Sequence, residues 1–375
     1  MQVPFLDLKA QYKSIREEVN AAIQDVLDNT AYVLGKAVFD FEAHFAQKHQ
    51  VKHCVGTSSG TDANHLVLWA LGLSAGDEVI IPANTFIATA WGATLCGARP
   101  VFVDVDKDSY NIDPKKVEAA ITKKTKAIVA VHLYGQAADM DPLRKIADKH
   151  GIYLVEDAAQ AHLAEYKGKP VGGLGIGSSF SFYPGKNLGA YGEAGAVLTN
   201  DDALGEKIKY MRDHGMPQKY NHEMFGHNYR MEGIQGAVLG VKLNHLEKWT
   251  QGRRRAAQKY RELLSGIPQI KVPEEMDYAR HVYHLFVIQL EQGGSAKRDK
   301  VAEYLKNNQI FTGLHYPVPL HLQKCFSELG YKHGDFPVTE KLSETGLSLP
   351  MFAELTDDQI GYVAGKIREF FKTDR

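Results

Sequence analysis

Short apolar runs that alternate with segments of helical length are the feature of this sequence that most restricts its fold. Four such runs, rich in valine and isoleucine, are residues 79–81, 101–103, 128–131 and 153–155. Strands that alternate with helices form mostly parallel sheets with helices on both faces. Two further strand-like runs, residues 179–183 and 196–199, follow close together. The sequence therefore predicts an α/β fold in which helices sandwich a mostly parallel sheet.

The pattern of apolar residues changes after about residue 230. Residues 233–264 have the apolar periodicity of one long helix. Its later part is basic, and we interpret this part as a solvated face formed by Arg253, Arg254 and Arg255. Shorter strands are predicted at residues 282–289 and 310–316, and a closing helix is predicted to begin with a capping box at Thr356.

These patterns predict two domains. A large α/β domain is expected over residues 1–245 and a smaller α+β domain over residues 246–375. Helical periodicity over residues 15–27 adds an N-terminal helix, for which packing against the small domain is an alternative.

Composition excludes several classes of protein. The 375 residues are 44% hydrophobic and carry 44 Lys+Arg against 45 Asp+Glu. This balance lacks the excess of positive charge that is typical of nucleic-acid-binding proteins. Three widely spaced cysteines do not form a disulfide framework and favour a reducing compartment. No secretory signal is visible, and no apolar run approaches the ~18 residues of a membrane span. We expect a soluble cytoplasmic protein.

Residues 56–63 combine glycines and hydroxyl side chains just before an apolar-periodic helix. Free backbone N–H groups at a helix start bind anions such as phosphate. A plain N-cap by Ser59 or Thr61 is the alternative. The same segment matches G-x-S-x-G, which would make Ser58 the nucleophile of a serine hydrolase.

Two later segments carry reactive side chains. Asp157 ends an apolar run, where parallel sheets place their ligands, although helix capping would also explain it. Lys186 follows another strand-like run and lies among glycines, where a lysine can form a Schiff base with a carbonyl compound. Metal catalysis is not supported, because His222 and His227 are five residues apart rather than the four of H-E-x-x-H.

In combination, these segments resemble a known family. The motifs are Ser59-Gly-Thr-Asp-Ala63, Glu156-Asp-Ala-Ala-Gln160, Ser181-Phe-Tyr-Pro-Gly-Lys186, Asn228-Tyr-Arg230 and His315-Tyr-Pro-Val-Pro319. Their order resembles the nucleotide-sugar aminotransferases, the DegT/StrS-like branch of the pyridoxal 5'-phosphate (PLP) enzymes of fold type I. The resemblance covers nearly the whole chain, and it implies a seven-stranded type of sheet, PLP as cofactor and a homodimer with active sites at the subunit interface.

The resemblance also implies a role for each matching residue. Lys186 would hold PLP covalently and move protons, and Asp157 would face the pyridine nitrogen. Gln160 would contact the phenolic oxygen and Phe86 the ring face. The cofactor phosphate would be bound by Gly60, Thr61 and Ser181, with Asn228 contributed to the neighbouring subunit. The candidate substrate contacts are Tyr183, Arg230, His315 and Tyr316.

The function implied is transfer of an amino group from L-glutamate to a nucleotide-linked keto-hexose, as in amino-sugar, polysaccharide and O-antigen biosynthesis. The sequence around Lys186 most resembles that of family members that aminate C-3 of a dTDP-linked 3-keto-6-deoxyhexose. Amination at C-4 and UDP-linked sugars are alternatives within the family. The sequence departs from the family at two positions, where Ala194 and Leu163 replace glycines that are frequent in other members, and we expect these changes to affect the fit of the substrate. A serine hydrolase using Ser58 and a non-catalytic PLP-binding regulator are alternatives from other classes.

Overall fold

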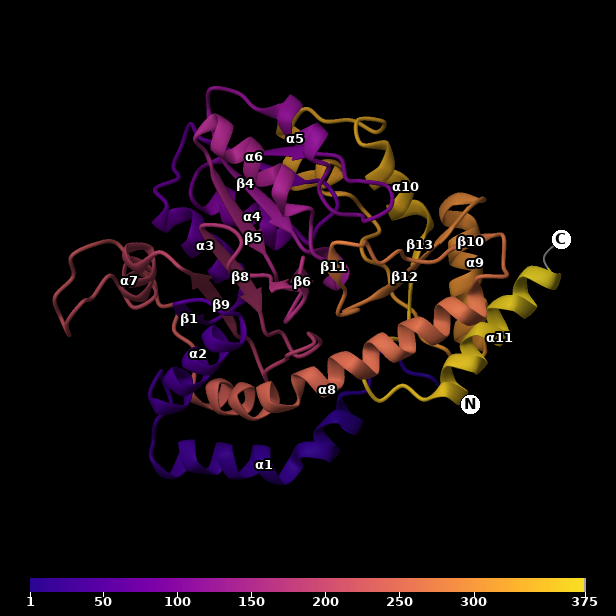
Figure 1. Ribbon diagram of the computed structural model, residues 1–375, viewed down its shortest axis with the longest axis horizontal. Coiled ribbons are helices and arrows are strands. Elements are labelled where there is room, and N and C mark those ends of the chain that lie inside the picture. Colours follow the sequence, from indigo (N-terminus) through magenta and orange to yellow (C-terminus); the bar gives the residue numbers. More distant parts are fainter. Residues whose placement is uncertain (374–375) are drawn as a thin grey trace.

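A seven-stranded sheet forms the centre of the larger part of the molecule in the computed structural model, which describes residues 1–373 (Figure 1). The strand order is β1-β9-β8-β5-β4-β2-β3. These strands are β1 (His53–Thr57), β2 (Glu78–Pro82), β3 (Arg99–Val103), β4 (Thr125–Val131), β5 (Tyr153–Asp157), β8 (Gly177–Ser181) and β9 (Gly195–Thr199). Only β9 runs antiparallel to its sheet neighbours. The predicted mostly parallel sheet is confirmed.

Both faces of this sheet are buried. Along β2, Ile80 belongs to one hydrophobic core, whereas Val79 and Ile81 belong to the other, because successive side chains of a strand point to opposite faces. The first core is covered by α2 (Lys36–Lys48), α5 (Pro114–Ala120) and α6 (Met140–His150), and the second by α3 (Gly60–Ala70), α4 (Ile87–Leu95) and α7 (Asp202–Met211). Helices on both faces explain why β2, β4 and β5 carry uninterrupted apolar runs.

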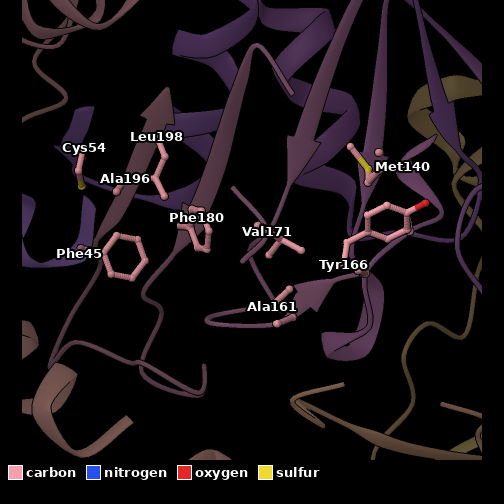
Figure 2. Close-up of a cluster of buried hydrophobic side chains, with 14 of the residues drawn as sticks. Phe45, Cys54, Met140, Ala161, Tyr166, Val171, Phe180, Ala196 and Leu198 are labelled. Carbon is pink, nitrogen blue, oxygen red and sulfur yellow. The ribbon is translucent and has the colours of Figure 1, made fainter. Parts of the chain in front are cut away.

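Figure 2 shows part of the first core. The rings of Phe45 on α2 and Phe180 on β8 meet edge to face, with their centroids 5.1 Å apart. Val171, Met140 and Tyr166 extend this core toward α6. The packing fixes β5 and β8 against the helices, and these strands position Asp157 at the end of β5 and Lys186 in the turn that follows β8.

Helix α8 (Gly233–Leu264) links this core to a second body of structure (Figure 1). Its first half contributes Leu239 and Leu246 to the sheet core, and its second half contributes Tyr260 and Leu264 to a separate core. The separate core also contains β12 (Phe286–Leu290), β13 (Gly346–Leu349), α9 (Gly294–Asn307) and α11 (Asp357–Thr373). Helix α1 (Leu8–Asp28) packs along the first half of α8.

The remaining elements are short. They are β6 (Glu165–Tyr166), β7 (Lys169–Pro170), β10 (Ile270–Lys271), β11 (Ala279–Arg280) and α10 (Pro337–Thr345). The strand β12 pairs with β10 and β13, and β11 pairs with β6. Within residues 1–373, no helix has both the length and the apolar content needed to cross a membrane.

The C-terminal third differs from the sequence prediction in two places. The strand expected at residues 282–289 begins only at Phe286. The strand expected at residues 310–316 is wrong: Ile310 pairs with Val3, and Gly313 pairs with Ser348 of β13, each as an isolated bridge. The segment therefore crosses from one neighbour to another instead of running along either. The predicted capping box is confirmed, because Thr356 and Gln359 exchange side-chain to backbone hydrogen bonds of 3.0 and 3.3 Å.

Candidate active site

A cavity of about 700 Å³ opens at the edge of the sheet where the parallel strands end. Ligands of parallel α/β sheets bind at this edge. Segments from the C-terminal third close its other side, including His284 and Met351. Most of the residues that the sequence singled out line this cavity: Gly60, Thr61, Phe86, Asp157, Gln160, Ser181, Tyr183, Lys186, His315 and Tyr316.

Asp157 is the last residue of β5, and its carboxylate accepts three hydrogen bonds. The donors are Nδ2 of Asn64 at 3.1 Å, Oγ1 of Thr89 at 2.7 Å and the backbone N–H of Ala159 at 3.1 Å. The bond from Ala159 closes a local turn, and the chain runs on through turns to β6, so the helix capping considered for Asp157 is wrong. Asn64 comes from α3 and Thr89 from α4. The side chain of Asn64 is held in turn by Oγ of Ser179, which donates to its Oδ1 at 2.7 Å. Together these donors fix the direction of the carboxylate.

Lys186 lies in the turn after β8, where its backbone N–H donates to the carbonyl of Tyr183 at 2.8 Å. Burial lowers the pKa of Lys186 to about 8, and the charge of Asp157 opposes this shift. Its Nζ has no hydrogen-bond or ion-pair partner among the described residues. An amine with a lowered pKa is partly uncharged near neutral pH and is therefore a nucleophile.

The N-terminus of α3 forms the third part of the cavity. Ser59 is its N-cap, since its Oγ accepts from the N–H of Asp62 at 3.1 Å. The next N–H groups, those of Gly60 and Thr61, have no partner within a helix. A Cβ on Gly60 would lie 2.6 Å from Cβ of Ser181, so only glycine allows the helix start to approach β8 this closely. The result is a cradle for an anion.

Gln160 joins the sheet side of the cavity to the opposite side. Its Oε1 accepts from the N–H of Tyr134 at 2.7 Å, and its Nε2 donates to the hydroxyl of Tyr316 at 3.0 Å. The hydroxyl of Tyr134 donates to the carbonyl of His315. Burial lowers the pKa of His315 to about 4, with the charge of Lys186 acting in the same direction, so this imidazole is neutral near pH 7.

Asn228 and Arg230 do not line the cavity of their own chain. They lie at the base of the segment that follows α7 and projects from the body of the molecule (Figure 1), because Arg230 forms an isolated bridge with Thr57 of β1 and Asn228 forms one with Asp213. Arg230 donates from Nε to Oδ1 of Asn228 at 3.0 Å and forms an ion pair of 2.9 Å with Asp213. The side chain of Asn228 is exposed.

The comparison with known families agrees with this geometry. The DegT/DnrJ/EryC1/StrS aminotransferase family matches residues 13–368. The chain belongs to this family. It is thus a PLP-dependent aminotransferase, and Lys186, Asp157 and the N-terminus of α3 line one cavity.

Relatives of this aminotransferase are similar over their whole length. A "pleiotropic regulatory protein" of Geobacillus stearothermophilus is 46% identical over 99% of both chains. A dTDP-3-amino-3,4,6-trideoxy-alpha-D-glucose transaminase of Streptomyces venezuelae is 43% identical, covering 98% of this chain and 96% of its own. The crystal structure of DesV from S. venezuelae superposes with a TM-score of 0.95 at 44% identity and covers 98% of both chains. Other relatives are named for UDP-linked and GDP-linked sugars.

The residues present in the cavity fit PLP. The cradle of Gly60 and Thr61 suits a phosphate, Asp157 suits a protonated ring nitrogen, and Lys186 suits an aldehyde. Solved structures of the same fold include forms with PLP and with pyridoxamine phosphate.

Sequence reasoning missed several residues of this aminotransferase site. No local sequence pattern predicts that Asn64 and Thr89 contact Asp157. The interpretation of Arg253 as part of a solvated face is wrong: only 4% of its surface is exposed, and it lines the cavity. A signal for its burial was present, since Arg253 lies seven residues from both Leu246 and Tyr260 on the buried face of α8.

The hydrolase alternative has no support in the geometry. The hydroxyl of Ser58 donates to Asp62 at 2.6 Å, and no histidine of the described chain contacts it. A triad needs a histidine in that place. Across residues 1–373, no group of three or more histidine, cysteine or acidic side chains could hold a metal ion.

Proposed function

We propose that this aminotransferase moves the amino group of L-glutamate to C-3 of a dTDP-linked 3-keto-6-deoxyhexose. The observation that supports the chemistry is the position of the Lys186 amine in one cavity with Asp157 and the N-terminus of α3. The likeness to the S. venezuelae transaminase supports the choice of a dTDP-linked sugar and of C-3. UDP-linked sugars and amination at C-4 are the alternatives within the family.

The chemistry divides between the cofactor and the chain. When bound, PLP supplies the carbonyl that takes up the amino group and the ring that stabilises the negative charge left on the substrate carbon. Nζ of Lys186 would take the proton from the amino-bearing carbon of L-glutamate and pass it to the cofactor in the first half-reaction, and it would carry a proton from the cofactor to C-3 of the sugar in the second. The carboxylate of Asp157, fixed by Asn64 and Thr89, keeps the ring nitrogen protonated.

The other predicted residues bind and orient. Gly60, Thr61 and Ser181 hold the phosphate, Gln160 contacts the phenolic oxygen, and Phe86 covers one face of the ring. Tyr183, His315 and Tyr316 contact the sugar. Phe86 and Tyr183 are 51% and 54% exposed, so they border the open side of the cavity and can contact a bulky substrate.

We further propose a homodimer, located in the cytoplasm, in which Asn228 and Arg230 reach the cavity of the partner. Their position outside their own cavity supports this arrangement. Mixing two inactive variants tests it. One subunit type carries Lys186→Ala and the other Asn228→Asp, so each mixed dimer has one site with both residues intact. We expect activity to reappear on mixing, and two variants that stay inactive in confirmed mixed dimers would contradict the shared site.

The substrate is tested by product analysis. PLP-loaded protein is incubated with L-glutamate and either a dTDP-linked 3-keto-6-deoxyhexose, its 4-keto isomer or a UDP-linked 3-keto sugar. We expect the 3-keto dTDP sugar to yield an amino sugar fastest, with 2-oxoglutarate formed in equal amount. Faster conversion of the 4-keto or UDP-linked compound would replace the proposed substrate, and conversion of none of them would remove the proposal.

A further inference from the structure

Arg253 is a buried arginine of α8 in the wall of the cavity. Its Nη1 donates to the carbonyl oxygens of Tyr283, His284 and Met351 at 3.2, 3.3 and 3.0 Å. These bonds attach one end of the guanidinium to the backbone of two C-terminal segments. Carbonyl oxygens carry only partial charge, so they orient the guanidinium without neutralising it.

The remaining donors of Arg253 are unused. Its Nε and Nη2 form no hydrogen bond with the residues that the structure describes, and none of their carboxylates forms an ion pair with it. Glu354 is close enough for its charge to act on Arg253, but it makes no direct contact. Buried polar atoms that lack a partner include Nε of Arg212 and of Arg261 but no atom of Arg253. Its free donors are therefore not sealed inside the protein and face the cavity.

Arg253 is charged under ordinary conditions. Burial lowers the pKa of its guanidinium only to about 10, so the group keeps its proton at neutral pH. A buried charge that forms no ion pair is unfavourable, and an anion that enters the cavity and pairs with it would relieve that cost.

A chain of contacts connects Arg253 with the residue that follows Lys186. His284, whose carbonyl accepts from Arg253, contacts Oδ1 of Asn187 through Nδ1 at 3.1 Å, and Asn187 follows Lys186 in the chain. Burial lowers the pKa of His284, and the positive charges of Lys186 and Arg253 add to this effect. The imidazole of His284 is therefore neutral and lies near both Lys186 and Arg253 in one cavity.

We propose that Arg253 binds the carboxylate of the amino donor that adjoins its amino-bearing carbon. The inference rests on the proposed function, because it takes an amino acid as the donor. That carboxylate is one bond from the carbon that gives up its amine, so it must lie near Lys186. The Nε and Nη2 donors of a guanidinium form the fork that matches a carboxylate.

The diphosphate of the nucleotide sugar is a poorer match for Arg253. It is attached at C-1 of the hexose, away from the reacting C-3, and it carries the bulky nucleoside. A side chain that is 4% exposed lies too deep for such a group. The amino donor, in contrast, is small enough to enter the cavity completely.

Binding of glutarate, which is L-glutamate without its amino group, tests the proposal without any reaction. We would titrate PLP-loaded wild type, Arg253→Met, Arg253→Lys and Arg254→Met by calorimetry. Arg254 is the matched control, because it is the neighbouring arginine on α8, pairs with Glu275 at 2.6 Å and does not line the cavity. We expect Arg253→Met to weaken glutarate binding about 10- to 100-fold, as for lost hydrogen bonds to a charged group. Arg254→Met should leave it within about twofold.

Arg253→Lys keeps the charge but loses the fork, and we expect glutarate binding about three- to tenfold weaker. If Arg253→Met does not fold, the glutarate affinity of Arg253→Lys decides whether the proposal holds. Unchanged glutarate binding in a folded Arg253 variant would overturn the proposal. So would a selective loss of PLP affinity, or a selective rise in KM for the sugar, because Arg253 would then bind a phosphate. Failure of the proposed function looks different: wild type would bind glutarate through Arg253, yet L-glutamate would not yield the amino sugar.

Discussion

The cavity has two walls, and different kinds of contact hold them. The sheet wall consists of Gly60, Asp157, Ser181 and Lys186, and the C-terminal wall consists of Arg253, His284, His315 and Tyr316. On the sheet wall, a strand ladder and two helices fix Asp157. On the C-terminal wall, His315 depends on single contacts between distant segments, such as the 2.8 Å contact of its Nδ1 with Oγ of Ser348.

This difference indicates that the two walls have different functions. Asp157 ends a strand of the sheet and Gly60 begins a helix, and the many backbone bonds of these elements resist displacement. His284, His315 and Tyr316 stand on loops, where a change alters the shape of the cavity at little cost to the fold. Changes on the sheet wall should therefore reduce catalysis or cofactor binding with any substrate, and changes on the C-terminal wall should act on substrate affinity.

Asp157→Asn should have the largest effect of the changes that leave Lys186 in place. It removes the charge that faces the ring nitrogen, so we expect kcat to fall about 10²- to 10³-fold with L-glutamate and with the sugar alike. Stopped-flow rates of both half-reactions measure this.

Glu156 provides the control on the same strand. Its carboxylate is fully buried and accepts from Nε2 of His132 at 2.9 Å and from the N–H groups of Gly172, Leu174 and Gly175. Glu156→Gln should lower the melting temperature and leave the rates per folded molecule nearly unchanged. Equal kinetic losses in the Asp157 and Glu156 variants would contradict the distinction between adjacent residues.

The pH dependence of cofactor uptake should show the lowered pKa of Lys186. Because the uncharged amine reacts, we expect the rate of PLP uptake by cofactor-free protein to rise about tenfold per pH unit and level off near pH 8. The unfolded lysine stays protonated up to about pH 10.5, so this group makes stability rise with pH between 8 and 10.5.

Lys242 is the matched control for this titration. Burial also lowers its pKa to about 8, but its Nζ donates to the carbonyl of Gly189 at 2.6 Å, and it does not line the cavity. Lys242→Met should leave the midpoint of PLP uptake unchanged. A midpoint near 10.5 in the wild type would show that Lys186 is not in the environment described.

Gly60→Ala tests the contact between α3 and β8. The added Cβ would lie 2.6 Å from Cβ of Ser181, so the helix start must move away from the cradle. We expect PLP affinity to fall about tenfold, the loss of roughly one charge-assisted hydrogen bond. Fluorescence titration with PLP measures it. Gly240→Ala on α8, where a Cβ meets nothing within 4 Å, should leave PLP affinity unchanged.

Tyr316→Phe should have the smallest effect and a different signature. It removes a hydroxyl that accepts from Gln160, so we expect KM for the sugar to rise about three- to tenfold while the L-glutamate half-reaction changes less. Tyr331→Phe is the control, since that hydroxyl accepts from the N–H of Phe102 at 3.1 Å and lies outside the cavity. A loss confined to the L-glutamate half-reaction would contradict the proposed contact of Tyr316 with the sugar.

The sequence predicts the sheet wall better than the C-terminal wall, for physical reasons. The strands β2 to β5 are apolar on both faces because helices cover both sides of the sheet, and this composition is visible in short windows. The helix α8 was predicted with its observed bounds, because its periodicity is long and regular. Asp157 and Lys186 follow strand-like runs, so their places at the ligand-binding edge could be inferred.

The C-terminal wall depends on contacts that no short window contains. Residues 310–316 look like a strand, yet their partners are Val3 and β13, which lie far away in the sequence. Arg253 looks like a solvent-exposed charge among its basic neighbours, and only its position on the buried face of α8 distinguishes it. The partners of Asp157, Asn64 and Thr89, belong to the sheet wall but likewise meet it only through tertiary folding.

The most direct test of the central claim is the visible spectrum of the protein with PLP, before and after addition of L-glutamate, for wild type and Lys186→Ala. The claim is that Lys186 is the reactive amine of an aminotransferase site. We expect wild type to show the absorbance of a lysine-bound cofactor, L-glutamate to bleach it, and Lys186→Ala to lack it. A wild-type band that L-glutamate leaves unchanged, or the same band and bleaching in Lys186→Ala, would contradict the claim.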